Sequence, residues 1–134
     1  MLEFIAARGS ASFLQTPAWA RVKSEWRGER VGFYDGDELT GVGLILYRKL
    51  PKLPRYLAYL PEGPVLDWSR DDIAEHFDAL VTHVKKRQAF AVRIGPAVVH
   101  RIWGTKTIKT AIADDNITSL TEVEPDVVTP EGEH

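Results

Sequence analysis

The sequence contains no cysteine and no apolar run that approaches the roughly 20 residues a membrane-spanning helix needs. The lack of cysteine excludes disulfides, thiolate nucleophiles and cysteine-based zinc or iron–sulfur sites. Neither sign of charge predominates: the chain has 17 Lys and Arg and 19 Asp and Glu, which gives a formal net charge of -2. The whole molecule therefore exerts no strong pull on nucleic acid, and any phosphate recognition must come from local clusters of cations.

Length and composition indicate one folded domain. A chain of 134 residues, 44% hydrophobic and 27% charged, can bury about two thirds of the surface that its unfolded form exposes. Residues 1–11 lack the basic start and long apolar core of a signal peptide. We therefore expect a cytoplasmic protein, which would meet a membrane-bound substrate peripherally, at the inner face of the membrane.

Two helices are predicted from their first residues. Thr16 can cap free amides and Pro17 fits a first helical turn, so residues 16–27 are expected to form an amphipathic helix. Asp71 and Asp72 are expected to cap the longest helix, which ends at three successive cations.

Turn residues divide the remaining sequence into strands. Asp-Gly within residues 35–37 predicts a hairpin, and prolines break the basic stretch 48–55 into a surface loop. Strands are predicted at residues 30–34, 38–47, 56–59 and 89–94. Beyond them, residues 105–113 and 117–123 alternate only weakly. Three consecutive strands, then a helix that crosses to a further strand, predict an α+β fold with a mixed, mostly antiparallel sheet flanked by helices.

Three segments carry a resemblance to a known family: residues 15–23 (QTPAWARVK), 56–68 (YLAYLPEGPVLDW) and 90–96 (FAVRIGP). In this order they resemble the FemABX family of aminoacyltransferases, which add amino acids to the stem peptide of peptidoglycan precursors. The resemblance implies a GNAT-like fold that forms one half of a tandem architecture. It also implies that residues 1–134 are a single N-terminal domain cut from a longer two-domain protein. The acidic residues 129–133 then look like the start of a further helix.

The same resemblance implies substrate-binding residues. Lys23, in the matching Trp-Ala-x-Val-Lys segment that begins at Trp19, would contact the diphosphate of the precursor. Gly63 and Pro64 would line the precursor groove, and Tyr59 and Arg93 are further groove-side candidates. The structural alternatives are a lysine on a solvated helix face, a plain turn at residues 62–64, and an arginine that ties the sheet to Asp67 or to a carboxylate of the tail.

Metal and cofactor sites are not expected. His76 and His83 are seven residues apart, too far for the i, i+4 pair of zinc proteases, and neither Asp71 nor Asp72 resembles half of an acid–base pair. The sequence also lacks the glycine-rich turn before a helix with which acetyltransferases of this fold hold the CoA pyrophosphate. No cofactor is therefore predicted, and the catalytic residues are expected in the absent second domain.

The predicted activity is that of the intact protein. The partners are a peptidoglycan precursor (a UDP-linked muropeptide or lipid II), an aminoacyl-tRNA as donor, and the missing C-terminal GNAT-like domain. Basic clusters at residues 48–55, 85–87 and 101–109 are candidate tRNA contacts, with 48–55 favoured. The isolated domain is expected to be inactive. Two alternatives stay open: a GNAT-type N-acyltransferase for a small amine, and a non-catalytic GNAT-like binding module.

Overall fold

The longest strand of the protein, β2 (Glu38–Lys49), is the centre of a five-stranded sheet. The computed structural model describes residues 1–8 and 11–129. Antiparallel to β2 lies β1 (Arg27–Asp35), joined to it by a tight turn in which Gly36 has a φ of 57°. Positive φ suits glycine, so the predicted Asp-Gly hairpin is confirmed, with both strands longer than expected.

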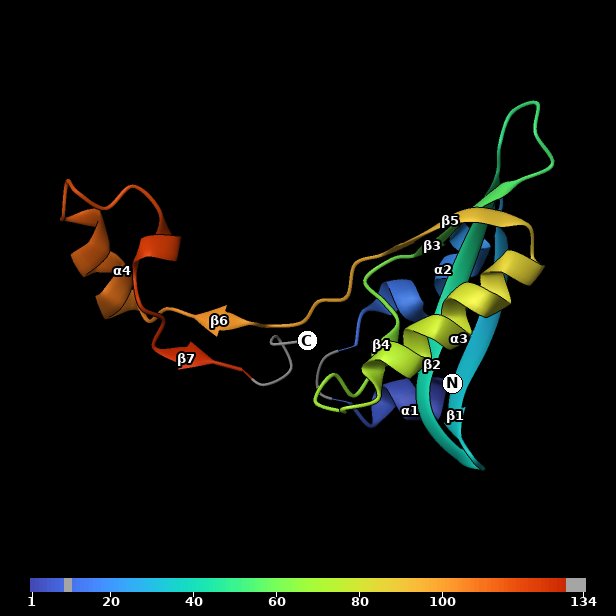
Figure 1. The fold of residues 1–134 in the computed structure, drawn as a ribbon, viewed down its shortest axis with the longest axis horizontal. Helices are drawn as coiled ribbons and strands as arrows, with labels where there is room; N and C mark the ends of the chain where they lie inside the picture. Colours follow the sequence, from blue (N-terminus) through green and yellow to red (C-terminus); the bar gives the residue numbers. More distant parts are fainter. Residues whose placement is uncertain (9–10, 130–134) are drawn as a thin grey trace. The chain divides into compact units, whose positions relative to one another are not determined.

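On its other side β2 pairs with two short strands. Both β3 (Tyr56–Leu60) and β4 (Val65–Leu66) run antiparallel to it, and β3 then pairs in parallel with β5 (Ala89–Ile94). The sheet order is β1-β2-β3-β5 with β4 beside β2. The predicted mixed, mostly antiparallel sheet is therefore confirmed (Figure 1).

Helices cover both faces of this sheet. The apolar side of α3 (Ile73–Lys86) packs with Ile45 and Leu60, which point to one face, and together they form the main core. Because side chains alternate along a strand, Leu44 and Leu46 point to the opposite face. That face is covered by α1 (Leu2–Ala6), the 3₁₀ turn η1 (Phe13–Gln15) and α2 (Pro17–Val22), which contact β2.

The prediction of a helix over residues 16–27 was wrong at its end. The helix α2 stops at Val22, a turn follows, and β1 begins at Arg27. Trp26, which has helical spacing from Trp19, packs instead on Tyr59 of β3. Sequence spacing could not reveal that contact, since its two rings are brought together only by the folded sheet.

Both predicted helix caps were wrong in chemistry. The hydroxyl of Thr16 donates to the carbonyl of Phe13 at 2.7 Å and caps no amide of α2. Asp72 stands before α3, but its carboxylate accepts two bonds from Arg70, at 2.7 and 2.6 Å. Both oxygens of the Asp72 carboxylate thus bond the neighbouring guanidinium, and neither caps an amide of α3.

Within the described residues, positions 98–129 belong to a second small unit. Within it β6 (Arg101–Ile102) pairs with β7 (Val127–Val128), and α4 (Thr105–Ile112) and the turn η2 (Leu120–Glu122) lie between them in sequence. The weak alternation at residues 105–113 thus belongs to a helix. The predicted start of a further helix at residues 129–133 falls almost wholly outside the described residues.

Candidate functional site

An alternating strip of cations and aromatic rings crosses one face of the sheet. Arg48 lies over the ring of Trp26 at 5.6 Å, the rings of Trp26 and Tyr59 are 6.2 Å apart, and Arg93 lies over Tyr59 at 5.7 Å. We call these four residues the Arg–aromatic strip. The parallel register of β3 and β5, which sets Tyr59 opposite Arg93, builds half of it. Two of the predicted site residues are therefore neighbours.

The alternative role considered for Arg93 does not occur in the described residues. There its guanidinium makes no ion pair, with Asp67 or with any other carboxylate, and its side chain is exposed. A cation over an aromatic ring contributes about 0.5–1 kcal/mol at an exposed site. That contact orients the guanidinium while its N–H donors stay available to an anion.

Lys23 and Trp19 form a second cation–aromatic pair at the end of α2. The ammonium nitrogen of Lys23 is 5.4 Å from the centre of the Trp19 ring, and Phe13 packs edge-on against that ring at 5.6 Å. Among the described residues Lys23 has no carboxylate within ion-pair distance. The two predicted residues of α2 are thus adjacent, and the charge of Lys23 is not neutralised within the described part of the chain.

Gly63 and Pro64 occupy a bend between β3 and β4. Both are buried, whereas Glu62 is exposed with a φ of 48°. The carbonyl of Gly63 accepts a bond from the N–H of Gly95 at 3.4 Å, which joins the bend to the end of β5. A Cβ on Gly63 would overlap the side-chain amide of Gln15. The group that approaches the glycine most closely is therefore a side chain of the protein itself.

Sequence reasoning did not assign a role to Gln15. It is fully buried, and its amide bonds to Leu44 and to Pro61. The available signal was its place directly before Thr16 and Pro17, because a polar residue at the start of a packed helix must find partners when it is buried.

A hydrogen-bonded cluster of charged side chains lies on the other face of the sheet. Glu29 accepts hydrogen bonds from Arg87 at 2.8 Å and from Tyr47 at 2.7 Å, and His83 is 3.2 Å away. Burial would raise the pKa of Glu29, but the bonds from Arg87, Tyr47 and His83 outweigh it and lower that pKa to about 2. Burial and the bond to Glu29 raise the pKa of Tyr47. The cluster ties α3 to β1 and β2, a structural role.

Neither histidine of α3 joins a metal site in the described residues. His76 is buried against Thr40, with Nε2 2.9 Å from the hydroxyl, and His83 belongs to the cluster around Glu29. Over residues 1–8 and 11–129, no three His, Asp or Glu side chains converge as metal ligands. Across the same range, every helix is too short or too polar to cross a bilayer.

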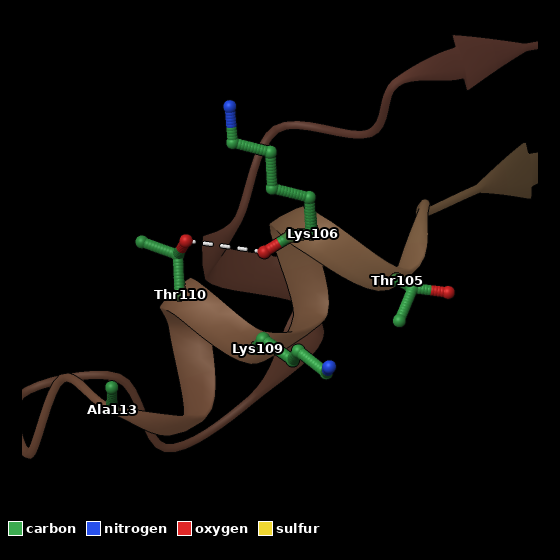
Figure 2. Close-up of a pocket in the computed structure, with 5 residues that line it drawn as sticks. All are labelled: Thr105, Lys106, Lys109, Thr110 and Ala113. Carbon is green, nitrogen blue, oxygen red and sulfur yellow. Dashed lines mark hydrogen bonds between the residues drawn. The ribbon is translucent and has the colours of Figure 1, made fainter.

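Among the described residues, two hollows lie away from the predicted site residues. One of about 350 Å³ lies between β1 and α3 beside Glu29. The other, about 650 Å³, runs along α4 in the second unit, where Lys106 and Lys109 point in different directions (Figure 2). Because these two ammonium groups do not point toward one place, they do not form a binding site for a single anion.

Residues 2–123 match the FemAB family, so the chain belongs to that family and the resemblance found in three short segments is confirmed. The match covers both the Lys23–Trp19 pair and the Arg–aromatic strip.

Curated relatives extend the comparison. The chain is 34% identical over 98 residues to the lipid II:glycine glycyltransferase of Staphylococcus saprophyticus, which covers 71% of this chain and 24% of that protein. It is 35% identical over 98 residues to the enzyme of the same name from Staphylococcus haemolyticus, covering 71% and 23%. The chain spans about a quarter of the length of these relatives.

A solved structure supports the same fold. The crystal structure of FemX superposes on 83% of this chain with a TM-score of 0.65 and 29% sequence identity, and the match covers 28% of the FemX chain. The sheet and its flanking helices therefore correspond to one part of the longer FemX chain.

Proposed function

We propose that this chain is the N-terminal, GNAT-like domain of an aminoacyltransferase that builds peptidoglycan bridges. In this proposal it binds the diphosphate or nucleotide end of the precursor. Family membership and the names of the glycyltransferase relatives support the reaction class. The observation that carries the binding role is Lys23, a cation held beside Trp19 without a carboxylate partner among the described residues.

The chemistry of the site suits an anionic acceptor. Lys23 is a compact point charge on a flexible stem, which can meet a diphosphate oxygen directly. Arg93 is oriented by Tyr59 and keeps its donors free for a second oxygen. The half-buried ring of Tyr59 offers a flat surface against which a sugar or base can pack. In this proposal Gly63 and Pro64 shape the wall of the groove through the backbone of their bend.

The intact protein would complete the reaction. An amine of the stem peptide attacks the ester carbonyl of an aminoacyl-tRNA, forming the amide and releasing the tRNA hydroxyl. Positioning of the two substrates contributes most of the acceleration, and amides and cations in the cleft stabilise the oxyanion. We place the catalytic groups in a C-terminal GNAT-like domain, so the isolated chain binds without turnover. A lipid-linked acceptor would bring the protein to the inner face of the membrane.

Backbone chemical-shift mapping tests this proposal. A ¹⁵N-labelled chain is titrated with a UDP-linked muropeptide, with a nucleotide-free muropeptide as the matched control. The largest shifts are expected at residues 19–26, 59, 63 and 93–95, and only with the UDP-linked ligand. Equal shifts with both ligands, or shifts confined to other residues, would exclude the diphosphate role. Acetyl-CoA serves as a third ligand: saturation by it would favour a small-molecule acyltransferase.

A further inference from the structure

Gln15 is a fully buried amide that joins three distant parts of the sequence. Its Nε2 donates to the carbonyl of Pro61 at 2.6 Å, and its Oε1 accepts from the N–H of Leu44 at 2.9 Å. Its partners are 46 and 29 residues away along the chain. A buried amide satisfied at both ends is costly to disturb, since each lost bond leaves a desolvated group unpaired.

The sheet register explains why an amide is needed at this place. The β2–β3 pairing ends at Leu46 with Tyr59, and continuing it by two residues would set Leu44 opposite Pro61. The β2–β4 pairing, however, sets Val42 opposite Val65. A regular continuation of the β2–β3 pairing would instead set Val42 opposite Gly63. The chain between Tyr59 and Val65 is therefore two residues longer than a regular ladder needs.

The extra residues push the bend away from β2. Leu44 and Pro61, which a regular ladder would bond directly, are bridged by the side chain of Gln15 instead. Pro61 has no N–H with which to return a second bond. The amide of Gln15 thus takes the place of a missing ladder bond and fixes how far the bend stands from β2.

Gly63 provides the space for this amide. A side chain at residue 63 would overlap the Gln15 amide, and the carbonyl of Gly63 in turn holds the N–H of Gly95. In the other direction along the chain, Gln15 is followed by Thr16 and then by α2, which carries Trp19 and Lys23. The side chain of Gln15 therefore joins the segment before α2 to β2 and to the bend, and the bend in turn bonds the end of β5.

We propose that Gln15 is a positioning residue: its amide sets where α2, with Trp19 and Lys23, stands relative to the Gly63 bend. The functional half of this inference rests on the proposed function, because it assumes that Lys23 contacts the precursor. The structural half stands on the hydrogen bonds and the register alone.

The structural half is tested by replacing Gln15 with Met, which has similar volume but can make neither bond. The matched control is Gln88→Met, because Gln88 is exposed and, among the described residues, only its backbone is bonded. In ¹H–¹⁵N spectra of the folded chain, Gln15→Met is expected to displace the Leu44 and Gly63 amides and the Trp19 indole. Gln88→Met should leave all three in place. Unmoved signals in Gln15→Met would overturn the proposal. If that variant does not fold, Gln15→Asn replaces it, because its neutral amide is one methylene too short to reach both Leu44 and Pro61.

The functional half is tested by a double-mutant cycle read as the Kd for a UDP-linked muropeptide. Lys23→Ala is expected to weaken binding about tenfold in the wild-type background and less than twofold in the Gln15→Met background. A tenfold effect in both backgrounds would show that Gln15 does not position Lys23. No effect of Lys23→Ala in the wild type would sink the proposed function instead, and the spectra would still decide the structural half.

Discussion

Arg87, the residue after the last turn of α3, donates two hydrogen bonds to one carboxylate oxygen of Glu29 in β1, from Nε at 3.2 Å and from Nη2 at 2.8 Å. The other oxygen of Glu29 accepts from Tyr47. The side of β1 that faces α3 is therefore held by these hydrogen bonds between charged groups as well as by apolar packing. The Glu29–Arg87 pair lies on the face opposite the proposed substrate site. Its removal therefore tests the stability of the fold separately from ligand binding.

Glu29→Gln is expected to lower the free energy of unfolding at pH 7 by about 2 kcal/mol, because Arg87 loses its anionic partner. The folded pKa of Glu29 is about 2, below the ordinary 4.5. Its stabilisation is therefore complete above about pH 4.5 and is lost as the pH falls towards 2. In urea unfolding at pH 7, 4.5 and 2.5, the difference in free energy of unfolding between wild type and variant should shrink as the pH falls. The exposed Glu25→Gln is the control, and a gap that stays constant would contradict the assignment.

Thr40→Val keeps the shape of a buried side chain and removes its hydroxyl. That hydroxyl donates to the carbonyl of Phe33 at 3.2 Å and lies 2.9 Å from Nε2 of His76. The variant removes one bond to the Phe33 carbonyl and takes the hydroxyl partner from the buried Nε2 of His76, so we expect a loss of about 1–3 kcal/mol in unfolding free energy. Thr82→Val, on the exposed side of α3, should change it by less than about 0.5 kcal/mol. If Thr40→Val and Thr82→Val change the thermal unfolding equally, the buried hydroxyl of Thr40 does not contribute to stability.

Gly63→Ala and Gly95→Ala differ in what the new methyl group meets. At Gly63 it would overlap the Gln15 amide, whereas at Gly95 nothing lies within 4 Å. We expect Gly63→Ala to cost about 1–3 kcal/mol, as overpacking of a buried site does, and Gly95→Ala to be nearly neutral. Denaturant midpoints measure both. A Gly63→Ala variant as stable as wild type would mean that the bend moves freely past Gln15.

Arg93→Ala should separate binding from stability. Its side chain is exposed and contacts the ring of Tyr59, so we expect the free energy of unfolding to fall by less than about 1 kcal/mol. Loss of a diphosphate contact should weaken binding of a UDP-linked muropeptide about three- to tenfold. Arg55→Ala, in the basic loop that we connect with tRNA, should leave this Kd unchanged. If calorimetry shows that Arg55→Ala weakens binding more than Arg93→Ala does, the muropeptide binds at the basic loop and not beside Arg93.

The sequence predicted the features that depend on neighbours along the chain. The Asp-Gly turn, the first three strands and the β5 run all follow from local alternation and turn chemistry, as does the end of α3. The pairing of Lys23 with Trp19 follows from helical spacing of four residues. These signals are short-range, so a single sequence suffices to read them.

Features made by distant contacts escaped prediction. The end of α2 depends on Trp26 meeting Tyr59, and the Arg–aromatic strip depends on the parallel register that sets Tyr59 opposite Arg93. The role of Gln15 depends on a two-residue offset between β3 and β4. Each arises from strand pairing over tens of residues, which the alternation of side chains does not encode.

Isothermal titration of the folded chain with a UDP-linked muropeptide decides whether Lys23 binds the diphosphate. It compares the wild type with Lys23→Ala and with the exposed control Lys86→Ala. We expect measurable binding by the wild type and by Lys86→Ala, and about tenfold weaker binding by Lys23→Ala, because that variant loses one charge-assisted contact. Equal affinities for all three proteins, or no heat from the folded wild type at millimolar ligand, would contradict this expectation.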